Sequence, residues 1–204
     1  MIKQIFVTVL ATITFLTSSG NAFAQKKERR NLIKRPKDSL TPANIAPYMK
    51  TKRYQQSHEI LEQDFWRLHE PEEQEEILSQ KKEIVLSIVT SDKDFQKLFR
   101  ARYWCAKNAV DIIPDLIELI KNPKTVGLEN EADTIIWERI ASGDLKFYGH
   151  GAVVPDDIFS VAGRASWILK EITAQNFGSV SMKSTSEELN RLSEAWAKWY
   201  EKNK

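Results

Sequence analysis

The chain has 204 residues, of which 42% are apolar and 28% charged, with seven glycines, one cysteine and a formal net charge of +2. This composition is typical of a soluble globular protein and excludes the disordered, collagen-like and polytopic membrane classes. The near balance of acidic and basic side chains argues against a dedicated nucleic-acid-binding protein.

Residues 1–24 have the three parts of a secretory signal peptide. Lys3 supplies a positive charge, residues 5–16 are an apolar run, and Ala22 and Ala24 form a small-x-small cleavage site. The run is shorter than the roughly 20 residues that span a bilayer, and no cysteine follows it to carry a lipid anchor. We expect the signal to be cleaved and the protein to be periplasmic or secreted in a bacterium, without a stable membrane anchor. The alternative is an uncleaved anchor.

Residues 25–50 are predicted to form a basic, proline-containing flexible arm. Its first part, residues 26–37, carries seven basic side chains against Glu28, and three prolines lie within the arm. Such a composition cannot bury much apolar surface. We interpret the arm as a solvated leader, with weak contact to an anionic surface through residues 26–37 as the alternative.

Residues 51–204 are predicted to form a single all-α domain. No glycine occurs between residues 25 and 126, whereas tight β-hairpins need glycine at positive φ. Apolar residues instead recur at helical spacing, which predicts a compact stack of about seven helices.

The first two helices are predicted from this spacing. The first runs from about Ser57 to His69, with a buried face made of Tyr54, Leu61, Phe65 and Leu68. The second opens at Pro71, and glutamates occupy its first turns, where the helix dipole favours acidic groups. Its predicted buried face consists of Ile77, Leu78, Ile84, Val85 and Ile88.

Start signals predict the next three helices. Residues 91–94, with the sequence SDKD, precede a third helix that reaches about Ala109. Pro114 opens a short fourth helix over residues 115–121. A fifth helix is expected over residues 128–140.

The helical spacing of apolar residues is interrupted at residues 143–155, which are predicted to be a glycine-rich loop with at most a small hairpin. Asp156 or Asp157 then caps a sixth helix, which residues 176–178 end. The apolar spacing of this sixth helix is close to the ideal helical pattern.

The last helix begins with a capping box, formed either by Ser184 with Glu187 or by Thr185 with Glu188. Its apolar stripe consists of Leu189, Leu192, Trp196 and Trp199. The tryptophans suggest sugar stacking, but their helical spacing favours core packing.

Cys105 is the only cysteine, so no intramolecular disulfide can form. It lies on an apolar helical stripe, which predicts a buried and unreactive thiol. Trp104 and Trp167 occupy matching positions in two predicted helices, each opposite the apolar stripe of its own helix. We expect both to pack between helices; exposed, they would instead form an interaction surface.

Two segments resemble a known family. The sequence AVDIIPDLIELIKN at residues 109–122 resembles the junction between paired helices of HEAT-type repeats, in which a proline opens the second helix. Residues 163–178, followed by Trp196 and Trp199, resemble the ending of exported bacterial HEAT-repeat-like proteins. The resemblance covers about residues 95–204 and implies an α-α superhelix or solenoid that acts as a scaffold for partners.

The candidate site is the glycine-rich loop with its flanks, which gathers Lys146, Tyr148, His150, Asp156 and Asp157. A neutral imidazole beside a carboxylate can bind a metal or act as a general base. The alternative is that the aspartates only cap the next helix. The sequence contains no zincin, nucleophile-elbow, phosphate-loop or paired-cysteine motif, so no metal or cofactor is assigned.

The leading hypothesis is an exported, non-catalytic helical module. It would bind a protein through a helix-lined surface and the loop around Tyr148 and His150, and so scaffold or neutralise an envelope protein. The alternative is a cell-envelope hydrolase or metal-dependent enzyme that uses His150 with Asp156 or Asp157. A third hypothesis is salt-sensitive binding to an anionic surface through the basic arm.

Overall fold

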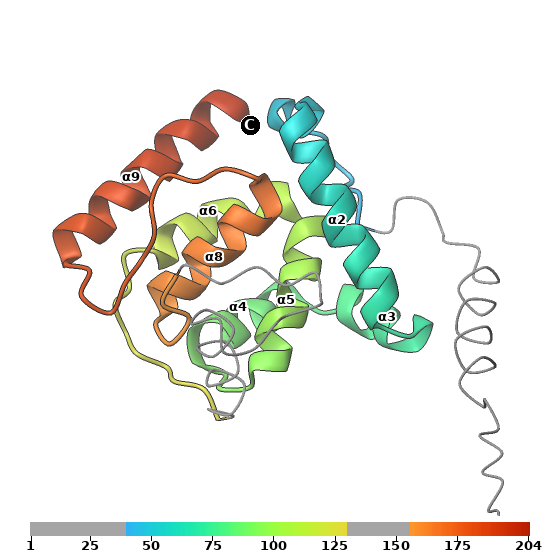
Figure 1. Ribbon diagram of the computed structural model, residues 1–204, viewed down its shortest axis with the longest axis horizontal. Coiled ribbons are helices and arrows are strands. Elements are labelled where there is room, and N and C mark those ends of the chain that lie inside the picture. The colour runs from blue at the N-terminus through green and yellow to red at the C-terminus, as the bar shows by residue number, and fades with distance from the viewer. Residues whose placement is uncertain (1–39, 130–155) are drawn as a thin grey trace, which may run out of the picture. The chain divides into compact units, whose positions relative to one another are not determined.

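The computed structural model of the protein describes residues 40–129 and 156–204. Within these ranges the chain forms seven α-helices and one 3-10 helix, and the strand-like pairing is limited to one isolated bridge between Thr125 and Ser160 (Figure 1). The all-α prediction is confirmed. The predicted signal peptide, the basic part of the arm, nearly all of the predicted fifth helix and the loop at residues 143–155 lie outside the described residues.

Leu40, the first described residue, is fully buried in the core. The 3-10 helix η1 (Pro47–Lys50) buries Tyr48 and Met49, and the Tyr48 ring lies 5.0 Å from the ring of Trp199. The prediction of a flexible arm to residue 50 is therefore wrong for its described part. Prolines and charged residues dominate the composition of this segment, but its few apolar side chains, among them Leu40, Tyr48 and Met49, pack in the core.

Helix α2 (Lys52–Leu68) starts earlier than predicted because Thr51 caps it, its side chain accepting from the Tyr54 amide at 3.3 Å. Tyr54, Leu61 and Phe65 are buried as predicted. Leu68 is exposed, in contrast to the prediction, because it belongs to the last turn of the helix.

The predicted second helix is two helices, α3 (Pro71–Leu78) and α4 (Lys82–Ser91). Pro71 opens α3, with Glu72 and Glu73 in its first turn, as predicted. The break between the helices changes the phase of the apolar pattern. Ile77, Val85 and Ile88 are buried, whereas Ile84 is 51% exposed.

Helix α5 (Phe95–Lys107) begins at its predicted signal, since the Asp94 carboxylate accepts from the Gln96 amide at 2.8 Å. Helix α6 (Ala109–Leu119) contains Pro114 in its interior, so the prediction that Pro114 starts a helix is wrong. A proline removes the bond that its N–H would make to the carbonyl four residues earlier. Here that carbonyl belongs to Val110, and the Tyr200 hydroxyl donates to it at 2.8 Å.

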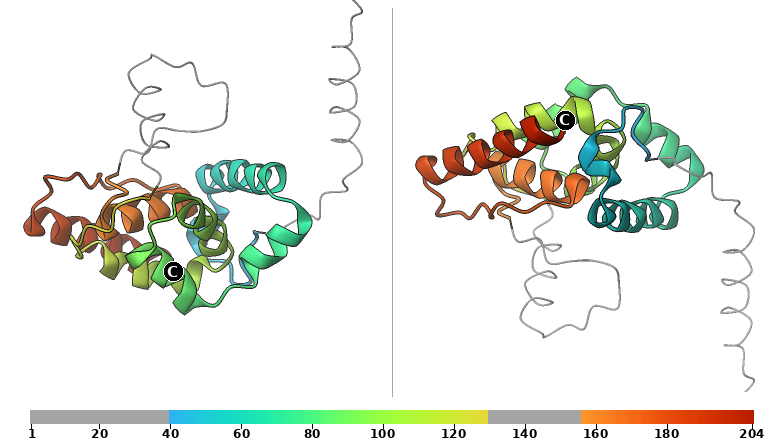
Figure 2. Two further views of the ribbon diagram at one scale, coloured as in Figure 1. Left: turned by 90° about the horizontal axis from the view of Figure 1, so that it is seen from below. Right: turned by 90° about the horizontal axis from the view of Figure 1, so that it is seen from above.

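Helix α8 (Val161–Thr173) is central in the described chain (Figure 2). It contacts α2, α4, α5 and α6, and every residue from Val161 to Leu169 is buried. Its cap is Ser160, whose hydroxyl accepts from the Gly163 amide at 3.1 Å. The prediction that Asp156 or Asp157 caps this helix is wrong. A Cβ on Gly163 would lie 1.9 Å from the Asp157 carbonyl oxygen, so glycine is required for this close approach.

Helix α9 (Ser186–Asn203) has the capping box of Thr185 and Glu188, one of the two predicted pairs. Trp196 is fully buried and Trp199 half-buried, which confirms the prediction of core packing. The helix packs on α6, where the Ser193 hydroxyl donates to the Ile117 carbonyl at 2.9 Å.

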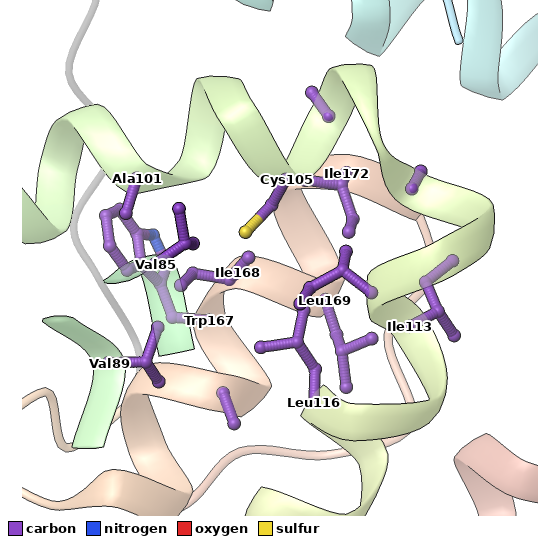
Figure 3. Close-up of a cluster of buried hydrophobic side chains, with 14 of the residues drawn as sticks. Val85, Val89, Ala101, Cys105, Ile113, Leu116, Trp167, Ile168, Leu169 and Ile172 are labelled. Carbon is purple, nitrogen blue, oxygen red and sulfur yellow. The ribbon is translucent and has the colours of Figure 1, made fainter. Parts of the chain in front are cut away.

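Cys105 is fully buried in the apolar cluster between α5, α6 and α8 (Figure 3), as predicted. Burial raises the pKa of its thiol well above the ordinary value. Trp104 and Trp167 are 6% and 4% exposed, which confirms the packed arrangement and excludes an exposed aromatic surface at these positions. The Trp104 indole donates to the Gln80 carbonyl at 2.7 Å, and the Trp167 ring stacks on Phe99.

Candidate binding site

Of the five predicted loop residues, the structure describes two, Asp156 and Asp157. Lys146, Tyr148 and His150 lie outside the described residues. The structure therefore defines the C-terminal flank of the predicted site and the chain segments that the flank contacts.

Asp156 anchors the connection between α8 and α9. Its side chain is fully buried, and its two oxygens accept from Lys170 Nζ at 2.8 Å and from the Val180 amide at 2.9 Å. Lys170 Nζ also donates to the Ser179 hydroxyl at 2.9 Å. Asp156 thus fixes residues 174–185, hereafter the α8–α9 connection, to the body of the protein.

Asp157 shapes the turn before α8. Its carboxylate accepts from the Phe159 amide at 3.3 Å, and its backbone amide donates to the Val180 carbonyl at 2.8 Å. The side chain is half-buried and lines a small hollow of about 180 Å³. Both aspartates therefore hold backbone in place, one through an ion pair and one through a turn.

A larger hollow of about 480 Å³ lies between the α8–α9 connection and the first turns of α9. Its apolar wall includes Phe177, Leu189 and Leu192. The remaining lining residues are Gly178, Ser179, Ser181, Lys183, Ser184, Glu188 and Arg191. The volume is within the range of ordinary ligand pockets, and we call this space the connection hollow.

Most polar groups of the connection hollow already have partners. The Ser184 hydroxyl accepts from the Ser181 amide at 2.9 Å, and Glu188 accepts from the Thr185 amide at 2.8 Å. Among the described residues, however, the side chains of Lys183 and Arg191 have no ion-pair or hydrogen-bond partner. The hollow therefore offers two available cationic groups beside an apolar wall.

The contact between Lys170 and Ser179 raises the question of a nucleophile. A serine hydroxyl becomes nucleophilic when an adjacent base accepts its proton. Lys170 instead donates to both the Ser179 hydroxyl and the Asp156 carboxylate. These two bonds tie Ser179 to Asp156 through the Lys170 side chain.

A second polar group lies in the interior, where α5 meets α8. The guanidinium of Arg102 donates to Glu171 at 2.9 Å and to the Tyr103 hydroxyl at 2.8 Å. It also lies over the Phe99 ring, 3.6 Å from the centroid. The ion pair and the cation–π contact stabilise the packing of the two helices.

His69 extends this interior group toward α3. Its Nδ1 lies 3.0 Å from a carboxylate oxygen of Glu73, which also forms an ion pair with Arg100. The contact with His69 and the positive charge of Arg100 hold the pKa of Glu73 below its ordinary value. None of these residues lines either hollow, so they act as links between helices.

Arg164 is a fully buried charged residue in the described part of the chain. Its guanidinium donates to the carbonyls of Ile158 at 2.7 Å, Asp92 at 2.7 Å and Gly127 at 2.8 Å. Burial lowers its pKa below the ordinary value. The residue joins the end of α4, the segment after α6 and the start of α8.

Sequence reasoning missed the connection hollow, although one signal for it was present. Residues 174–185 form a long connection that carries Phe177 and Met182, two apolar residues without helical or alternating spacing. Met182 is 86% exposed and Phe177 is 39% exposed. Large apolar residues in a polar connection are candidates for an interaction surface.

Comparison with family models, with curated proteins and with solved structures finds no match to the chain. None of the described helices has both the length and the apolar character of a membrane span. Within residues 40–129 and 156–204, no three His, Cys, Asp or Glu side chains are grouped as metal ligands. Function must therefore be inferred from the residues of the site.

Proposed function

We propose that the protein is an exported, non-catalytic helical module, similar in kind to HEAT-repeat proteins, that binds another protein. The observation that supports this function is the exposed surface around the connection hollow. It combines Phe177, Met182 and Arg191, and aromatic residues, Met and Arg are enriched at protein–protein interfaces.

The engagement of the other polar groups supports a non-catalytic role. Asp156, Lys170 and Ser179 form one structural unit, and Asp157 holds a turn. The competing hypothesis is an envelope hydrolase or metal-dependent enzyme with His150 as base or ligand. It needs a carboxylate beside His150, and Asp156 is a poor choice because it is buried against Lys170.

Site-specific photo-crosslinking in the native host tests the proposal. A photoreactive amino acid placed at Met182 is expected to capture one protein, which is then purified and titrated with the untreated protein by calorimetry. The matched control carries the same amino acid at Ile60, which is 57% exposed on α2 and lines neither hollow. Saturable binding of the purified partner supports the proposal.

Two results would contradict this function. The first is that positions 182 and 60 capture the same set of proteins, or that the purified candidate does not bind. The second is turnover of an envelope glycan or peptide by the purified protein, with loss of that turnover in His150→Ala.

A further inference from the structure

We infer that the connection hollow binds a short acidic segment of the partner protein, with carboxylates on Lys183 and Arg191 and an apolar side chain against Phe177. This inference rests on the proposed function and names the kind of partner sequence that the site would recognise.

The lining of the connection hollow has charges that complement an anionic ligand. Lys183 and Arg191 are exposed and lack side-chain partners among the described residues, whereas the one acidic side chain of the lining, Glu188, is engaged by the Thr185 amide. An arginine guanidinium binds a carboxylate through two parallel hydrogen bonds, and a lysine adds a second positive charge. The hollow therefore favours an anionic occupant.

The apolar wall of the connection hollow favours a peptide as the anionic ligand. Leu189 and Leu192 belong to this wall, and Phe177 packs edge-on against Trp196 with ring centroids 4.8 Å apart. Met182, which is strongly exposed, lines the smaller hollow, which shares Leu189 with the connection hollow. Aliphatic groups next to cationic ones suit a segment in which acidic and apolar side chains alternate, more than a sulfated or carboxylated glycan.

Hydrogen bonds fix the backbone on both sides of the connection hollow. The α8–α9 connection is held at Val180 by the Asp156 carboxylate and at Ser179 by Lys170. At its other end the capping box fixes the start of α9. A site whose backbone is fixed before binding loses less conformational entropy when the ligand binds.

The test uses purified full-length protein and two fluorescein-labelled peptides, the acidic peptide GDLEFDG and its neutral counterpart GNLQFNG. Fluorescence polarisation is expected to show saturable binding of the acidic peptide and roughly tenfold weaker binding of the neutral one, since the two exposed charge-assisted contacts together contribute about that factor. The double variant Lys183→Gln/Arg191→Gln is expected to bind the acidic peptide roughly tenfold more weakly and the neutral peptide unchanged.

The matched control is Lys52→Gln/Arg53→Gln, which removes one lysine and one arginine from the exposed start of α2. It is expected to bind the acidic peptide like the parent protein. All four substituted side chains are exposed, so circular dichroism is expected to show unchanged folding.

Four results overturn the inference: no saturable binding of the acidic peptide up to about 1 mM, equal affinity for the two peptides, equal weakening in both double variants, or tighter binding of polygalacturonate than of the acidic peptide. If the crosslinked partner still binds Lys183→Gln/Arg191→Gln at full affinity, the acidic-segment inference fails while the proposed protein-binding function stands. If no partner protein is found, both the acidic-segment inference and the proposed protein-binding function fail.

Discussion

The guanidinium of Arg164 donates its hydrogen bonds to backbone carbonyls and not to a carboxylate. Three segments far apart in the sequence direct their carbonyl oxygens at its guanidinium. The acceptors include the end of α4, where the helix dipole is negative and stabilises a cation. This role could not be predicted from the sequence, because every residue has a backbone carbonyl and the residue types do not show which carbonyls will surround Arg164.

Arg164→Leu is expected to lower the free energy of unfolding by about 3–5 kcal/mol, since it leaves several buried carbonyls without donors. Urea denaturation followed by circular dichroism measures the loss. Arg53→Leu, at an exposed position of α2, is the control and is expected to change stability by less than about 0.5 kcal/mol. Equal effects of the two substitutions would contradict the structural role of Arg164.

Other single residues were predictable. Cys105 is buried as its place on the apolar stripe indicated, because apolar periodicity reports directly on which face of a helix is covered. Trp104 and Trp167 lie opposite the stripes and are buried as well, because α5 and α8 each pack against several helices. The residue types of Asp156 and Asp157 suggest a chemical site, whereas in the structure both carboxylates accept from backbone amides. A carboxylate near a helix start has several available amides, and sequence alone does not show which one it accepts from.

At the scale of elements, the start of α9 distinguishes the two predicted capping pairs. Thr185 and Glu188 form the box, while Ser184 accepts from the Ser181 amide. Thr185→Ala is expected to lower the unfolding free energy by about 1 kcal/mol through loss of the cap. Ser186→Ala, one residue into the helix, is the control, and thermal denaturation compares the two. An equal melting temperature for both variants would exclude the assigned cap.

The contact between α3 and α5 is expected to depend on pH through Glu73. Its pKa is lowered in the folded protein, so the carboxylate stabilises the fold above the ordinary value of 4.5, and this contribution is lost as the pH falls through the lowered value. Glu73→Gln is therefore expected to lower the melting temperature at pH 7, and the difference from the parent protein is expected to disappear in acid.

Glu72→Gln is the control for this pH experiment. Glu72 lies in the same helical turn, is exposed and has no ion pair among the described residues. A loss from Glu73→Gln that is the same at pH 7 and at pH 3 would show that the side chain acts through packing and not through charge.

Helix boundaries were predicted less well than helix identity. The sequence contained the start signals at Pro71, Asp94 and Thr185, and the structure uses all three. It did not show that α3 and α4 are separate, or that α6 continues through Pro114. Both outcomes depend on tertiary contacts, which override local propensity.

At the scale of the molecule, the packed region extends further toward the N-terminus than composition indicated. Leu40 and Ile45 belong to the same proline-containing segment, yet Leu40 is fully buried and Ile45 is 52% exposed. Leu40→Ala is expected to lower the unfolding free energy by roughly 2–5 kcal/mol and Ile45→Ala by less than about 0.5 kcal/mol. Urea denaturation compares them, and a negligible effect of Leu40→Ala would restore the interpretation of this segment as an arm.

The pairing of Pro114 with Tyr200 has a consequence for the order of folding. The Val110 carbonyl of α6 lacks its usual helical donor, and the hydroxyl that replaces it comes from the last turns of α9. Until α9 packs on α6, water is the donor available to this carbonyl, so the hydrogen bonding of α6 is completed within the protein only when the last described helix docks. The final ordering of α6 therefore depends on a residue that lies 90 positions later in the chain.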